Sequence, residues 1–183
     1  MLFRSVIGAL PHEIVPVKPG NVAAGMNDLA AELKKRGDDE ASAQSPEMFV
    51  LIHGLQNYKK LRQDDEFGFS SGGDEGANPA AVLLKLITEG PALGIHVIVT
   101  CDTYNNVTRA LGRKTLSEFE MRVLFQMSAS DSASLVDDPA ASTLGLHRAL
   151  FYNDREGYRE TFRPYALPGN EWIEDVAKQL KRK

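Results

Sequence analysis

The chain has 183 residues, enough for one domain of ordinary size with a short extension. It carries 25 acidic and 21 basic residues, so its charge excludes a uniformly basic nucleic-acid-binding protein but allows a local basic face. The single cysteine, Cys101, excludes an internal disulfide and a zinc site built on cysteines. No apolar run reaches the roughly 18 residues that a membrane-spanning helix needs.

The apolar spacing predicts helices that alternate with buried strands. Helices are expected at 21–36, 80–89 and 171–180, with shorter ones that start at Thr115 and Asp131. Strands buried on both faces are expected at 48–52 and 95–101, with a third strand at 122–127 and a hairpin of 149–153 with 160–163. This order predicts an α/β domain with a mainly parallel sheet flanked by helices and closed by a C-terminal antiparallel hairpin.

Two polar stretches interrupt this pattern. Residues 37–47 are typical of an exposed linker, and residues 63–78 of an acidic, glycine-rich surface loop. The carboxylates of the second stretch do not have the spacing of a calcium loop, so no metal site is expected there. These carboxylates are Asp64, Asp65, Glu66, Asp74 and Glu75.

Parallel sheets bind ligands at the carboxyl ends of their strands, where this chain has His53 and Asp102. His53 could bind a ligand, stabilise a developing charge or shuttle protons, or it could simply bond to a neighbouring loop. Asp102 could hold a metal or orient a water, but a helix cap is the commoner use of such a residue. Cys101, just before it, is interpreted as a small buried residue rather than a nucleophile.

Two further groups of polar residues could contact phosphate. Asp131 and Ser132 follow the third strand, where they could form an anion-binding helix start or only cap the helix. Arg109, Arg113 and Lys114 form a small basic cluster that could meet DNA or a neighbour's nucleotide, or could be a solvated face. The chain contains no Gly-x-x-x-x-Gly-Lys-Ser/Thr phosphate loop and no His-Glu-x-x-His zinc motif.

Several segments resemble one family when they are taken in order. They are residues 90–100 (GPALGIHVIVT), 122–128 (RVLFQMS), Asp131-Ser132 with Leu135 and Asp137, Leu144-Gly145, and 149–152 (ALFY). Together they resemble the FtsK/SpoIIIE-type motor ATPases over residues 48–168. The resemblance implies the second half of a RecA-like P-loop fold, with 48–52 as the Walker B strand and 97–101 as the neighbouring sensor strand.

The same resemblance divides the chain into three parts. Residues 1–47 would be an N-terminal helix and linker, 48–168 the ATPase part, and 169–183 a helix with a basic tail. The phosphate loop is expected upstream of Met1. Residues 2–5 (LFRS) match the translation of a common sequencing adapter, so residues 1–5 are expected to be an artefact of a contig edge.

The chain departs from the family at three positions that would serve hydrolysis. The Asp-Glu pair that ends the family's Walker B strand is His53-Gly54 here, the sensor Gln is Asp102, and the Arg after Asp-Ser is Ala133. A neutral imidazole is a poor magnesium ligand and glycine cannot act as a base. We therefore expect a degenerate or remodelled hydrolytic site, with His53 and Asp102 as the candidates at the catalytic positions.

The resemblance also implies partners. The intact protein would bind ATP and Mg²⁺ and form a homo-oligomeric ring that pulls double-stranded DNA, although related rings move polypeptides. The chain alone is expected to bind neither ATP nor Mg²⁺. Arg122, Asp131 and Ser132 would be candidate nucleotide contacts, and the basic cluster would contact DNA or the next subunit. A cytoplasmic location is expected, and the intact protein could be tethered to a membrane.

Two other functions fit the residues. The first is a non-catalytic interaction or regulatory domain that binds partners through the hairpin 149–163 or the acidic loop. The second is a small-molecule enzyme that uses His53 and Asp102 as a pair on adjacent strands.

Overall fold

The computed structural model describes residues 8–38, 45–63 and 78–181 and contains two sheets. β1 (Met48–Ile52) and β2 (Ile95–Val99) form a parallel pair. The second sheet is antiparallel in the order β3 (Met121–Leu124), β4 (Ala149–Asn153), β5 (Tyr158–Phe162). The helices are α2 (Val22–Asp38), α3 (Pro79–Thr88), α4 (Tyr104–Ala110), α5 (Arg113–Ser117), α6 (Ala129–Val136) and α7 (Asn170–Leu180). The mixed α/β fold and its C-terminal antiparallel hairpin are confirmed.

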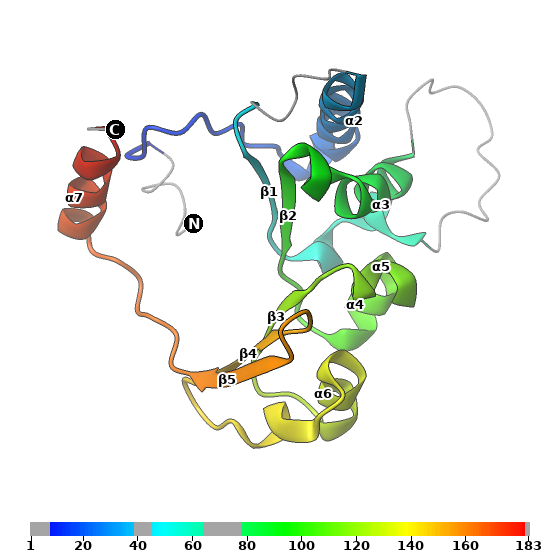
Figure 1. Cartoon of the computed structure of the whole chain (residues 1–183), viewed down its shortest axis with the longest axis vertical. Helices are drawn as coiled ribbons and strands as arrows, with labels where there is room; N and C mark the ends of the chain where they lie inside the picture. Colours follow the sequence, from blue (N-terminus) through cyan, green and yellow to red (C-terminus); the bar gives the residue numbers. More distant parts are fainter. Residues whose placement is uncertain (1–7, 39–44, 64–77, 182–183) are drawn as a thin grey trace.

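Helices α2 and α3 cover one face of the parallel pair (Figure 1). Ile52 and Ile95 on that face are buried and pack in one core with Leu83 and Leu86 of α3. The start of α3 follows the sequence prediction, because Asn78 Oδ1 accepts a hydrogen bond from the N–H of Ala80 at 2.9 Å. Helix α7 lies apart from both sheets, at the end of an extended segment (Figure 1).

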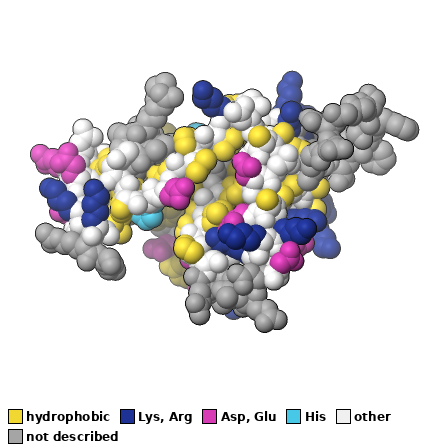
Figure 2. All heavy atoms as spheres, turned by 90° about the horizontal axis from the view of Figure 1, so that it is seen from above, with side chains coloured by type: hydrophobic (Ala, Val, Ile, Leu, Met, Phe, Trp, Pro, Cys, Tyr) yellow, Lys and Arg dark blue, Asp and Glu magenta, His cyan; other side chains and the backbone are white. Residues whose placement is uncertain are grey.

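The other face of the parallel pair is open in the part of the chain that the structure describes. Phe49, Leu51 and Ile98 point away from α2 and α3, and are 57%, 70% and 49% exposed. The expectation that these strands are buried on both faces is therefore wrong for the described residues. Hydrophobic side chains reach the surface across the middle of the molecule in Figure 2. Parallel sheets are normally covered on both faces, so this surface is unusual.

The third predicted strand lies in the antiparallel sheet and does not extend the parallel one. β3 pairs with β4, with Val123 opposite Phe151. The chain returns between them through α6 and a 3₁₀ turn at Pro139–Thr143, so that it runs back along β3 in the opposite direction. Leu124 and Leu150 then close a second core with Val136 of α6.

Arg122 connects three elements around this second core by hydrogen bonds. Its Nε donates to the carbonyl of Phe119 at 3.0 Å, and its terminal nitrogens donate to the carbonyls of Leu116 (3.3 Å) and Leu135. The guanidinium also lies 5.9 Å from the centre of the Tyr152 ring. These contacts join α5, β3 and α6.

The starts of two short helices were predicted at the wrong residue. α5 begins at Arg113, and Thr115, the expected cap, is buried inside it. α6 begins at Ala129, and its cap is Ser128, whose Oγ accepts from the N–H of Asp131 at 3.1 Å. In both helices the expected cap residue lies inside the first turn instead.

Ser128→Ala is expected to destabilise the protein by about 1 kcal/mol, because the N–H of Asp131 loses its acceptor. Asp131→Ala is expected to cost less, because Asp131 contributes only a favourable charge in the first turn of α6. Urea unfolding of both variants measures the two losses. A larger loss for Asp131→Ala would show that Asp131 is the cap, as the sequence predicted.

An ion pair between Asp138 and Arg159 connects the turn after α6 to β5. The hydrogen bond from Arg159, together with one from the N–H of Ala140, holds the pKa of Asp138 below its ordinary value of 3.8. A carboxyl whose pKa is lowered by folding stabilises the fold above its ordinary pKa and loses that contribution as the pH falls through the lowered value.

Arg159→Leu is therefore expected to lower stability at neutral pH, and the difference from the unaltered chain should shrink as the pH falls below 3.8. Urea unfolding at a series of pH values measures this difference. Arg155→Leu in the hairpin turn is the control, because Arg155 has no ion-pair partner in the described residues. A constant difference across the acidic range would show that the charge of Asp138 does not stabilise the fold.

Candidate functional site

The carboxyl ends of β1 and β2 lie side by side. The strands are parallel and in register, with Ile52 opposite Val99 at their last residues. The backbone continues the pairing, because the N–H of Thr100 donates to the carbonyl of Ile52 at 2.9 Å and the N–H of Leu55 donates to the carbonyl of Thr100 at 2.8 Å. The residues that follow the strands, His53 and Thr100, are therefore neighbours.

The hydroxyl of Thr100 joins the two strand ends. It accepts from the N–H of Gly54 at 2.9 Å and lies 3.0 Å from Nδ1 of His53. Gly54 has φ 72°, a left-handed conformation that glycine adopts without strain, and a Cβ there would lie 2.6 Å from Nδ2 of Asn57. The turn thus depends on Gly54, and Thr100 orients the imidazole. Sequence reasoning considered His53 but missed Thr100.

Asp102 lies two residues before the first residue of α4, Tyr104. Its Oδ1 accepts from Nδ2 of Asn106 at 2.8 Å, and this bond holds the pKa of the carboxyl below its ordinary range, so Asp102 is ionised at neutral pH. The cap itself is Thr103, whose Oγ1 accepts from the N–H of Asn106 at 3.3 Å. Asp102 therefore supports the first turn of α4 through a side chain and keeps an exposed charge.

The Cys101 thiol is not activated. Burial raises its pKa, and its Sγ lies 3.8 Å from the negatively charged Asp102. A thiol with a raised pKa stays protonated at neutral pH and is a poor nucleophile. Cys101 also packs against the first core.

The side chains at this edge do not fit a magnesium ion. The residues that follow β1 are His53 and Gly54, which offer an imidazole and no side chain. Of residues 53, 54 and 100–102 at the two strand ends, Asp102 alone carries a carboxylate. Magnesium prefers oxygen ligands in octahedral geometry. Among the residues that the structure describes, no three His, Cys, Asp or Glu side chains gather into a metal site. No metal-assisted hydrolytic step follows from this arrangement.

The other predicted site residues lie away from the β1–β2 edge in sequence. Ser132 is fully buried, donates to the carbonyl of Asp138 and accepts from the N–H of Ala141 at 3.1 Å. Arg122 is engaged by three carbonyls, as described above. These contacts favour structural roles for both, and their proposed nucleotide contacts stay predictions.

The basic cluster spans two helices. Arg109 lies in the last turn of α4, and Arg113 and Lys114 lie in α5. All three are exposed, and none of their side chains has a hydrogen-bond or ion-pair partner within the described residues. The acidic carboxylates considered for calcium lie outside the described residues, as do residues 1–5.

Comparisons with known proteins add little. No family model matches the sequence, and no curated protein matches it. Among solved structures, the chain is similar to the genome packaging NTPase B204 from Sulfolobus turreted icosahedral virus 2, in complex with ATP-gammaS. The identity is 10% over 84% of this chain and 74% of that chain, with a TM-score of 0.48. A similarity this weak supports no inference about this chain. None of the helices in the described part is long and apolar enough to cross a membrane.

Proposed function

We propose that this chain is the C-terminal part of an ATP-binding motor module of the FtsK/SpoIIIE type, with a RecA-like P-loop fold and an altered hydrolytic site. The observation that carries the proposal is the parallel pairing of β1 and β2, with their carboxyl ends in register. The sequence resemblance requires the Walker B and sensor strands to be neighbours with this polarity. Parallel sheets bind ligands at this edge.

The open side of the molecule supports the same proposal. β2 pairs only with β1, and β3 only with β4, so each of these strands has one unpaired edge within the described residues. Phe49 and Leu51 of β1 and Ile98 of β2 lie exposed on the open face of the parallel pair. An apolar face and an open strand edge are features that a folded protein normally covers. In the proposed module, the part that carries the phosphate loop covers this face.

The site residues set the expected chemistry. His53 and Gly54 replace the two carboxylates that would hold the magnesium shell and polarise water, so hydrolysis by the usual route is not expected. Asp102 supplies an ionised carboxylate next to this edge, and we propose that it has inherited part of that role. The 183-residue chain alone is expected not to hydrolyse ATP, because it has no phosphate loop.

Asp102→Asn tests this role in the intact protein. The amide oxygen of asparagine can still accept from Asn106, so the variant removes the charge but keeps the support of α4. We expect steady-state ATP turnover to change, with no change for the control Glu156→Gln in the exposed hairpin turn. Unchanged kinetics in Asp102→Asn would remove the carboxylate role. ATP hydrolysis by the chain alone, abolished by a point change within it, would contradict the fold proposal.

We propose that the intact protein forms a homo-oligomeric ring and that the polymer it moves is double-stranded DNA. Arg109, Arg113 and Lys114 are exposed cations without partners in the described residues, and so remain available for phosphate contacts. Binding that uses them should weaken steeply with salt, because neutralised phosphates release counterions. The proposed compartment is the cytoplasm.

A second candidate is a non-catalytic interaction domain, which the open apolar face and the His53-Gly54 pair also favour. A phosphate loop in the same protein would argue against it. A small-molecule enzyme based on a His53–Asp102 pair is not proposed, because Thr100 engages His53 and Asn106 engages Asp102.

A further inference from the structure

A pocket of about 550 Å³ lies at one end of the antiparallel sheet, where β3 ends, β4 begins and β5 ends. Its lining residues are Phe125, His147, Arg163, Pro164, Tyr165 and Ala166. None of them belongs to the β1–β2 edge, so the pocket is a separate candidate site. The volume falls within the range of cavities that hold small ligands.

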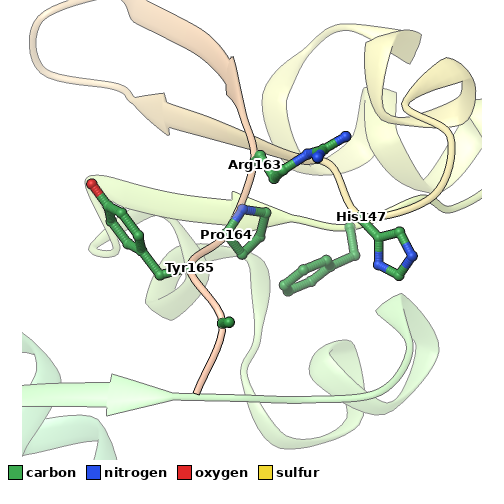
Figure 3. Close-up of a pocket in the computed structure, with 6 residues that line it drawn as sticks. His147, Arg163, Pro164 and Tyr165 are labelled. Atoms are coloured by element: carbon green, nitrogen blue, oxygen red, sulfur yellow. The ribbon is translucent and has the colours of Figure 1, made fainter. Parts of the chain in front are cut away.

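The pocket combines a guanidinium, an imidazole and aromatic side chains. His147 and Arg163 lie on the same side of Pro164, and Tyr165 lies on the opposite side (Figure 3). Neither His147 nor Arg163 has a hydrogen-bond or ion-pair partner within the described residues. Phe125 is apolar yet 60% exposed. No carboxylate lines the pocket, although the chain as a whole has a net charge of −4.

The backbone of His147 is strained. Its φ of 59° lies in the left-handed region, which residues other than glycine adopt at a cost. The turn that contains it begins at Gly145, which also has a positive φ of 72°. His147 lines the pocket in this conformation. Residues in such conformations cluster at active sites and ligand-binding sites.

We propose that this pocket binds a nucleotide unit, with the phosphate between Arg163 and His147 and the base stacked on Phe125. A guanidinium matches the geometry of phosphate oxygens with two parallel hydrogen bonds. Aromatic side chains bind bases by stacking, whatever the base. The ligand is either a free nucleotide or one unit of a single-stranded nucleic acid, because both present this chemistry. The assignment does not depend on the proposed ATPase edge, and it replaces the expectation that the chain alone binds no nucleotide.

Fluorescence anisotropy on the 183-residue chain tests the proposal with two probes, a fluorescent ADP analogue and a fluorescein-labelled oligothymidylate. Arg163→Glu and Phe125→Ala are each expected to weaken binding roughly tenfold or more. Arg163→Lys should lose less, because it keeps the charge but loses the paired hydrogen bonds. Arg155→Glu is the matched control, since it reverses an exposed charge in the turn at the opposite end of the same hairpin.

His147→Gly separates binding from folding. Glycine relieves the strain at φ 59°, so this variant is expected to be at least as stable as the unaltered chain while it binds more weakly. Binding of the ADP analogue alone identifies a free nucleotide as the ligand, and binding of the oligonucleotide alone identifies a strand. Failure of the unaltered chain to bind either probe overturns the proposal. An equal loss of affinity in Arg155→Glu also overturns it.

Discussion

Replacing Arg36 with methionine is expected to destabilise the fold by about 3 kcal/mol, the largest single-residue effect that we predict. The side chain of Arg36 is only 5% exposed and makes four hydrogen bonds. It donates to Oε1 of Glu32 at 2.8 Å and to three carbonyls on other segments: Leu93 (3.0 Å), Gly94 (3.2 Å) and Pro46 (3.0 Å). Methionine fills a similar volume but leaves these acceptors without their donor.

The loss of stability concerns the parallel pair because of where these carbonyls lie. Leu93 and Gly94 precede β2 and Pro46 precedes β1, so Arg36 fixes α2 against the starts of both strands. Urea unfolding measures the loss. Lys35→Met is the control, since Lys35 is 77% exposed and pairs with Glu32 only at 3.9 Å, which predicts a loss below about 0.5 kcal/mol. Equal losses for the two variants would contradict the role of Arg36.

Arg122→Met is expected to destabilise the protein by about 2 kcal/mol, because three backbone carbonyls lose a charged donor. The loss of stability should be greatest in the part of the molecule that contains α5, β3 and α6. Hydrogen exchange of the β3 and β4 amides, together with urea unfolding, measures it. Arg148→Met provides the control, because Arg148 is exposed and has no partner in the described residues.

This experiment also decides between two roles for Arg122. The family resemblance implies a contact with a neighbouring subunit's phosphates, whereas the structure shows the guanidinium bound within its own chain. If the stability of Arg122→Met equals that of Arg148→Met and ATP turnover falls in the intact protein, the structural role is wrong.

The parts of the fold that could be predicted from the sequence are those that local signals determine. β1 matches its predicted bounds because the short apolar run 48–52 has polar residues on both sides. α3 begins at Asn78-Pro79 because these two residues supply a cap and a fixed φ. The hairpin of β4 and β5 follows from its turn residues. The starts of α5 and α6 were harder to place, because several Ser, Thr and Asp residues near each start could act as a cap.

The rest depends on contacts between distant residues. The antiparallel pairing of β3 with β4 follows from the path of α6 between them, which no local pattern in 121–124 reveals. Arg36 bonds to residues 57 and 58 positions away, and Thr100 bonds to His53 across 47 positions. The pocket at His147 was missed for a similar reason, since its lining comes from three separate segments of the chain. The one local signal, Gly145 two residues before His147, marks a turn but not a pocket.

Sequencing the source gene upstream of the codon for Val6 tests the central claim most directly. The account predicts an open reading frame that continues upstream and encodes a Gly-x-x-x-x-Gly-Lys-Ser/Thr loop after a buried strand. That strand and its helix would then cover the open face at Phe49, Leu51 and Ile98. An authentic start codon at Met1, or continuous upstream coding sequence without such a loop, would contradict the nucleotide module and favour the interaction domain.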